Sequence, residues 1–238
     1  MSANVRVSTV ISASFSYFCR RFHRWQTLGL RVHSIMKEQE KVKMEPSFLY
    51  NDLNVFLGKY FKEKVQKISL NAGFSCPNRD GTVGHGGCTY CNNQTFNPDY
   101  CQTDKSITCQ LEEGKAFFSR KYPDMKYLAY FQAYTNTYAG LEELKRKYEE
   151  ALSVPGVVGL VIGTRPDCMP DELLDYLARL NRQTFLLVEY GIESTNDATL
   201  SRINRGHTYQ TARDAILLPG YTRAAMSSWD CPERGMTH

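Results

Sequence analysis

The sequence of 238 residues predicts an α/β protein, a partial (β/α) TIM-like barrel of parallel strands that is incomplete at its C-terminal end. Three observations predict this class. Segments of strand length alternate with amphipathic segments of helix length. Residues 157–164 are almost continuously apolar, as expected of a strand buried on both faces. Polar clusters follow the strands, at the end where barrels gather their chemistry.

The individual elements follow from the spacing of apolar residues along the chain. Four segments have the length and composition of strands, and they lie at 65–70, 126–134, 157–164 and 185–192. Helical spacing, or a proline at a first helical turn, marks the segments 47–62, 106–122, 141–152, the stretch that begins at Pro170, and 196–203. Right-handed crossovers would curl these units into a barrel or a doubly wound sheet.

Both ends of the chain differ in character from the middle. Residues 1–37 carry six basic side chains and no acidic one, which indicates either an organellar presequence or upstream sequence translated from too early a start. We therefore expect residues 1–43 to be an extension outside the core and 44–216 to form the core. Residues 217–238 follow neither period and are expected to be an unpatterned tail.

Composition excludes several classes of protein. The formal net charge of +4 includes the basic extension, so the rest of the chain lacks the basic balance of a nucleic-acid-binding protein. No run of 18 apolar residues occurs, and no membrane-spanning helix is expected. Eight cysteines are too sparse for a secreted disulfide scaffold. Their clustering favours metal binding in a reducing, cytoplasmic compartment.

The most informative cluster comprises Cys76, Cys88 and Cys91, on a glycine-rich loop after the first strand. Three thiolates can hold a 4Fe–4S cluster and leave one iron open as a reaction site, whereas four would close the cluster. One alternative is a structural zinc site in which Cys101 supplies a fourth thiolate. Another is an iron–sulfur protein that carries electrons without catalysis.

The residues around these cysteines extend into a longer pattern. Six segments make up this pattern: Gly73-Phe-Ser-Cys-Pro-Asn-Arg-Asp-Gly-Thr, Gly86-Gly-Cys-Thr-Tyr-Cys-Asn, Tyr130-Phe-Gln-Ala-Tyr-Thr-Asn-Thr, Gly163-Thr-Arg-Pro-Asp-Cys, Gly191-Ile-Glu-Ser and Ile203-Asn-Arg-Gly-His207. On these segments the chain resembles, between about Tyr50 and Asp214, the radical S-adenosylmethionine (SAM) superfamily, and within it the bacterial YhcC-like group related to elongator-type enzymes.

The resemblance implies a chemistry. Cys76, Cys88 and Cys91 would bind a 4Fe–4S cluster, and its open iron would chelate SAM. One electron from an external donor would then cleave SAM to a 5′-deoxyadenosyl radical, while the protein orients and shields the cofactor. The resemblance leaves the catalytic residues and the substrate unknown. Relation to elongator-type enzymes suggests RNA, which the charge does not support.

The resemblance also implies SAM contacts. Gln132 and Asn136 would lie near the methionine amino group, Glu193 near the ribose and Arg205 near the methionine carboxylate. Each has a structural alternative: Glu193 shares a strand face with Glu189, either inside the barrel or on a solvated edge. Arg205 could cap a helix C-terminus.

Arg165 and Asp167 form a further polar pair after the third strand, and they would be either ligands or a structural pair in a turn. The barrel of the family continues for two more strands, so this chain is expected to end in an open edge after its fourth strand.

Overall fold

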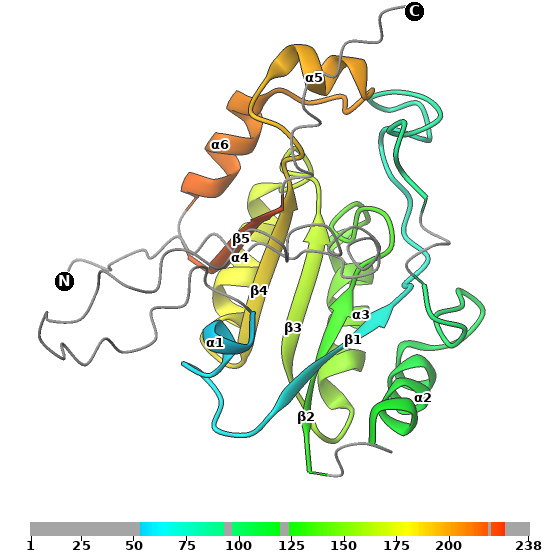
Figure 1. Cartoon of the computed structure of the whole chain (residues 1–238), viewed down its shortest axis with the longest axis vertical. Coiled ribbons are helices and arrows are strands. Elements are labelled where there is room, and N and C mark those ends of the chain that lie inside the picture. Colours follow the sequence, from blue (N-terminus) through cyan, green and yellow to red (C-terminus); the bar gives the residue numbers. More distant parts are fainter. Residues whose placement is uncertain (1–52, 93–96, 120–123, 219, 227–238) are drawn as a thin grey trace, which may run out of the picture.

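The computed structural model describes residues 53–92, 97–119, 124–218 and 220–226 (Figure 1). Its centre is one parallel sheet with its strands in sequence order. The strands are β1 (Val65–Leu70), β2 (Lys126–Phe131), β3 (Val157–Thr164), β4 (Phe185–Gly191) and β5 (Thr222–Met226). The prediction of an α/β protein made of parallel β/α units is confirmed.

The first strand is preceded by one helix, and helices lie between successive strands. They are α1 (Leu53–Leu57), α2 (Ile107–Ser119), α3 (Leu141–Ser153), α4 (Asp171–Leu180), α5 (Asp197–Arg202) and α6 (Tyr209–Leu217). Asn196 caps α5, because its side chain accepts hydrogen bonds from the backbone N–H groups of Ala198 and Thr199. Pro170 directly precedes α4, as the sequence predicts. Among the described residues, none of the helices is long and apolar enough to cross a membrane.

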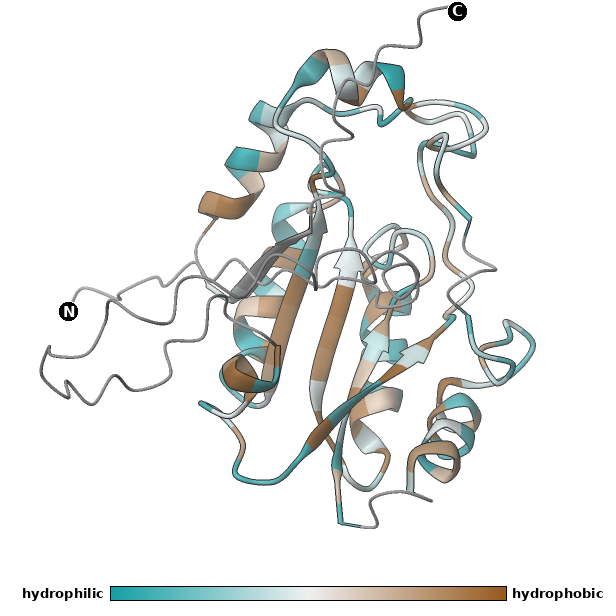
Figure 2. Cartoon of the chain, viewed as in Figure 1, coloured by the Kyte–Doolittle hydropathy of each residue, from teal (hydrophilic) through white to brown (hydrophobic). Residues whose placement is uncertain are grey.

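The two faces of the sheet are buried in different ways. One face packs on α2, α3, α4 and α6 and forms the larger core. On the opposite face, Phe56 and Leu57 of α1 cover Leu128, Val161 and Leu187 near the amino ends of the strands. Figure 2 shows the middle strands as hydrophobic, in agreement with burial from both sides. We call this second face the inner face. Near the carboxyl ends of the strands it carries polar groups.

The expectation of four strands with an unpatterned tail after Ile216 is wrong for residues up to Met226. The strand β5 lies in that tail and pairs in parallel with β4, from Leu187 with Thr222 to Gly191 with Met226. The helix α6 was also not predicted. The segment Thr-Arg-Ala-Ala-Met has only five residues, and two of them are alanine, which is depleted in strands, so its composition does not indicate a strand. Because β5 pairs with it, β4 is an interior strand.

Two expected boundaries also change or remain open. The strand expected over 126–134 ends at Phe131, because the backbone turns there and Tyr134 adopts a positive φ of 64°. The extension expected over residues 1–43, and the first part of the helix expected over 47–62, lie outside the described residues.

Candidate active site

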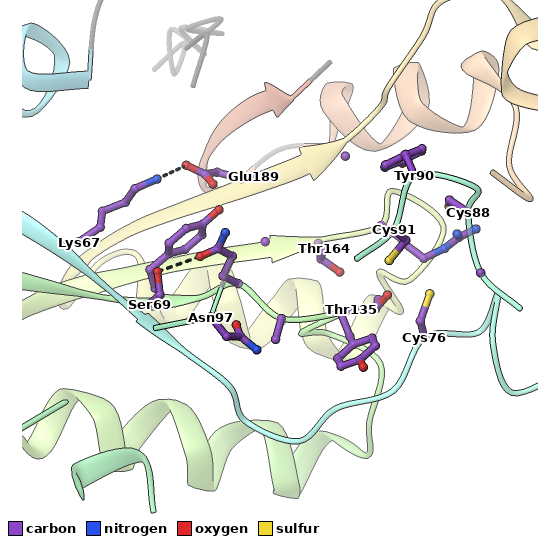
Figure 3. Close-up of a pocket in the computed structure, with 18 of the residues that line it drawn as sticks. Lys67, Ser69, Cys76, Cys88, Tyr90, Cys91, Asn97, Thr135, Thr164 and Glu189 are labelled. Carbon is purple, nitrogen blue, oxygen red and sulfur yellow. Dashed lines mark hydrogen bonds and ion pairs between the residues drawn. The ribbon is translucent and has the colours of Figure 1, made fainter. Parts of the chain in front are cut away.

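A pocket of about 480 Å³ lies at the carboxyl ends of β1 to β4, on the inner side of the sheet (Figure 3). Residues of all four strands or of the loops that follow them line it. Six of the residues singled out by sequence are among them: Cys76, Cys88, Cys91, Gln132, Glu193 and Arg205. Asn136 is not part of the lining.

The cysteine loop folds back on itself, as three thiols on one loop require. The N–H of Gly87 donates to the carbonyl of Asn78 (2.8 Å), and the N–H of Cys91 donates to the carbonyl of Cys88 (3.0 Å). Gly87 has a φ of +82°, and a Cβ there would lie 2.9 Å from Nε of Arg79. Glycine is therefore required at the point where the loop turns toward the pocket.

A segment more than a hundred residues further along the chain anchors this loop. The amide of Asn204 donates to the carbonyl of Gly87 (2.8 Å), and the N–H of Thr89 donates to the carbonyl of Ile203 (3.0 Å). In return, Asn78 donates to the carbonyl of Asn204. Figure 1 shows the loop and the end of α5 side by side. The cysteines are thus held by tertiary contacts as well as by their own turn.

The sulfur of Cys88 receives two hydrogen-bond donors. Nη1 of Arg205 lies 3.5 Å from it and Nδ2 of Asn78 lies 3.6 Å from it. N–H donors beside the sulfurs are a common surrounding of iron–sulfur clusters, whose properties they tune. The donor set at the mouth of the pocket therefore fits a thiolate-bound iron–sulfur cluster.

Arg205 is fixed on every side of its guanidinium and is only 7% exposed. Nη2 donates to the carbonyl of Gly191 (2.5 Å), and Nε donates to Nε2 of His207 (3.0 Å). Its backbone N–H also closes the end of α5 through the carbonyl of Leu200 (2.9 Å). Arg205 therefore combines a backbone role at a helix end with a side chain in the pocket.

Glu193 follows β4 in a left-handed conformation with a φ of 71° and faces the same pocket. A Cβ on Gly191 would lie 2.7 Å from Nη2 of Arg205 and 3.0 Å from Oε1 of Glu193, so both side chains depend on that glycine. Glu189 lines the pocket as well. Both acids therefore face the interior of the partial barrel and not a solvated edge.

Arg165 and Asp167 form a structural pair. Nε and Nη2 of Arg165 donate to the two carboxylate oxygens of Asp167 at 2.9 and 2.7 Å. Burial acts to lower the pKa of Arg165, but the bonds and charge of Asp167 outweigh it and the pKa is raised. Nη1 donates to the carbonyl of Arg205 (2.8 Å), so the pair holds the backbone of Arg205 in place.

The two amides expected near SAM lie in different settings. Gln132 faces the pocket, and its Oε1 accepts a hydrogen bond from the hydroxyl of Ser69 (2.8 Å). Asn136 is fully buried, and its Nδ2 donates to the carbonyls of Phe131 (3.0 Å) and Gly163 (2.8 Å). Asn136 thus ties the end of β2 to that of β3 behind the pocket wall.

Cys101, the fourth thiol of the zinc alternative, is buried in the larger core and does not line the pocket. Its S–H donates to the carbonyl of Ser69 (2.8 Å). Burial raises the pKa of its thiol to about 12, which disfavours the thiolate that zinc needs. Within the described ranges, no three His, Cys, Asp or Glu side chains are grouped closely enough to hold a single metal ion.

Sequence reasoning missed two features of the site. It did not single out Asn78, although its position two residues after Cys76 was a signal. It also missed the ion pair of Lys67 with Glu189, whose strands are far apart in sequence. The alternation of side chains along β1 and β4 places both residues on the inner face, but only the fold brings them together.

The fold and the pocket define an α/β protein of parallel strands with a thiol-lined site at the strand ends. Among known protein families, the Radical SAM superfamily matches residues 78–218, more than half of the chain. That match begins just after Cys76 and includes Cys88 and Cys91. The chain belongs to the radical SAM superfamily.

Individual relatives agree with this assignment. The chain is 48% identical over 162 residues to the uncharacterized protein YtqA of Bacillus subtilis, covering 67% of this chain and 50% of the relative. It is 44% identical over 167 residues to the protein YhcC of Escherichia coli, covering 70% and 53%. An uncharacterized protein of Methanocaldococcus jannaschii is 31% identical over 192 residues, covering 79% and 54%. The chain spans about half the length of these relatives.

Proposed function

We propose that the protein is a radical SAM enzyme that binds a 4Fe–4S cluster on Cys76, Cys88 and Cys91 and SAM in the adjoining pocket. The observation that carries the proposal is the convergence of these three thiols on one pocket, with two donors on the sulfur of Cys88. Such a cluster, reduced by an external donor, would supply the electron for the cleavage of SAM to methionine and a 5′-deoxyadenosyl radical.

The protein's own side chains orient and shield these groups. Arg205 and Asn78 donate to the sulfur of Cys88 and fix its loop. Arg205 also lies at the pocket wall, where the second N–H groups of Nη1 and Nη2 are proposed to donate to the methionine carboxylate of SAM. Glu193 is proposed to accept hydrogen bonds from the ribose, and Gln132 to contact the methionine amino group.

Asn136 has a different part in this proposal from the one the sequence suggested. Its side-chain amide is already bonded to the ends of β2 and β3, so it would support the SAM pocket by holding those strand ends. A non-catalytic iron–sulfur protein is the remaining alternative. It is kept as a candidate because the chain spans about half the length of the relatives it matches.

Anaerobic reconstitution tests the proposal. We expect one 4Fe–4S cluster per chain, with iron and acid-labile sulfide in equal amounts. Alanine at Cys76, Cys88 or Cys91 should abolish its visible absorbance. Alanine at Cys109, which is exposed on α2, is the matched control and should retain it. Zinc in place of iron would refute the cluster.

Binding and turnover then separate the enzyme from an electron carrier. Added SAM should change the electron paramagnetic resonance spectrum of the reduced cluster, because an open iron is a binding site. A reductant should then release 5′-deoxyadenosine. A normal cluster with an unchanged spectrum at saturating SAM would refute the enzyme and leave the carrier.

A further inference from the structure

An ion pair lies inside the half-barrel at the inner end of the pocket. Nζ of Lys67 on β1 is 3.1 Å from Oε1 of Glu189 on β4, and their side chains are 15% and 2% exposed. The ring of Tyr130 on β2 lies under the ammonium group, 4.1 Å from its centroid. Figure 3 shows this pair on the far side of the pocket from the cysteines.

The pair stands at a boundary on the inner face of the sheet. Toward the amino ends of the strands the face is apolar and covered by α1. Toward the carboxyl ends it carries Ser69 and Gln132, and at Gly163 and Gly191 it has no side chain at all. Space is therefore left between the ion pair and the cysteine loop, and the pair forms the floor of the pocket.

The carboxylate of Glu189 is incompletely bonded. Among the described residues, its Oε2 is buried and has no hydrogen-bond partner. A buried acceptor without a partner costs free energy, and a buried ion pair is often no more stabilising than apolar residues of the same size. Stability of the sheet alone therefore gives no reason for the pair.

The neighbouring groups define what would satisfy that oxygen. Lys67 uses one of its three N–H groups on Glu189, so others can donate to a ligand. Burial raises the pKa of Tyr130, and the charge of Glu189 and the closeness of its carboxylate to the Tyr130 hydroxyl raise it further, so the phenol stays protonated. The floor as a whole is neutral and offers a carboxylate acceptor beside ammonium and phenol donors.

We propose that Lys67 and Glu189 recognise the substrate, and that the substrate presents an amide-like edge, as in a carboxamide, urea or lactam. Its N–H would donate to Oε2 of Glu189, and its carbonyl would accept from Nζ of Lys67. A neutral edge suits this floor because the ion pair already balances its own charge. That the bound molecule is the substrate rests on the proposed function. Binding of an amide-like group to Lys67 and Glu189 can be measured independently of it.

Two small lactams test the recognition on the reconstituted full-length chain with SAM present. The probe is 2-pyrrolidinone, and N-methyl-2-pyrrolidinone is its matched control, since it keeps the ring and the carbonyl but has a methyl group in place of the N–H donor. Ligand-observed NMR should detect binding of 2-pyrrolidinone at least about tenfold tighter than that of the methylated lactam. Equal binding of the two would overturn the proposal.

Variants locate the binding. Glu189→Gln replaces one of the two carboxylate oxygens with an NH2 group. Because Nζ of Lys67 needs the remaining oxygen as its acceptor, the NH2 group should face the ligand and remove the preference for 2-pyrrolidinone. Glu142→Gln, on the exposed surface of α3, is the control and should retain it. Full preference in Glu189→Gln would return the ion pair to a purely structural role.

A second variant tests whether the loss of binding comes from misfolding. Lys67→Met combined with Glu189→Leu replaces the whole pair with apolar groups, which a core should tolerate. We expect a thermal midpoint close to that of the parent and no preference for 2-pyrrolidinone, whereas a retained preference would overturn the proposal. Iron content and the SAM-dependent spectrum are recorded in the same samples. Their loss with the lactam preference intact would refute the proposed function and leave this recognition standing.

Discussion

Replacing Arg205 by alanine is the sharpest test of how the site is built. The guanidinium donates to the sulfur of Cys88, the carbonyl of Gly191 and the ring of His207, all in buried surroundings. Alanine would remove all three bonds at once. It would also leave a buried carbonyl and a buried ring nitrogen without their donor.

The size of the effect follows from these contacts. A hydrogen bond that involves a charged group contributes about 1.5–3 kcal/mol. The three bonds share one side chain and are not additive, so we expect a loss of about 3–5 kcal/mol in the free energy of unfolding. Against a typical total of about 5–15 kcal/mol, that loss is large.

Urea denaturation of the cluster-free chain measures the loss, and iron analysis after reconstitution measures the consequence for Cys88. We expect Arg205→Ala to lower both stability and iron content. Arg205→Lys keeps the charge but not the three directed donors, and should fall between the parent and Arg205→Ala. A loss below about 1 kcal/mol with unaltered iron content would refute the reasoning, because the guanidinium would then not hold the cysteine loop.

Three further outcomes are expected. Gly159→Ala should lower the free energy of unfolding, measured by urea denaturation, by about 1–3 kcal/mol, because the new Cβ would lie 2.3 Å from a carbonyl oxygen of β4. Gly140→Ala is its control and should change that free energy very little, because the new Cβ would have no atom within 4 Å. Burial and the neighbouring guanidinium lower the pKa of His207 below its usual 6.5, so between the two pKa values the unfolded chain binds more protons. The thermal midpoint of the parent should therefore fall as the pH decreases from 7 through the range between these two pKa values, and it should fall less in His207→Gln. An equal fall in the parent and in His207→Gln would contradict this role of His207. Cys101→Ala should leave iron content unchanged, since its thiol is bonded within the core, and loss of iron would revive the zinc alternative.

Local patterns predicted most of the elements. The run 157–164 coincides with β3, because a strand buried on both faces is apolar at almost every position. The amphipathic segment 141–152 gave α3 to within a residue, because one face of a helix must meet the sheet. By contrast, β5 was missed, since a five-residue segment with two alanines has no strand-like pattern of its own and becomes a strand by pairing with β4.

The sequence by itself determined the α/β class, the glycine-rich loop and the three cysteines that face the pocket, because alternation, turns and short spacings are local properties of a chain. Only the tertiary structure decided which distant groups meet: Arg205 with the sulfur of Cys88, Arg165 with the backbone of Arg205, and Lys67 with Glu189. It also placed Cys101 in the core. Each of these contacts joins residues from separate β/α units, and their distances exist only once the parallel strands have brought their carboxyl ends to one edge of the sheet.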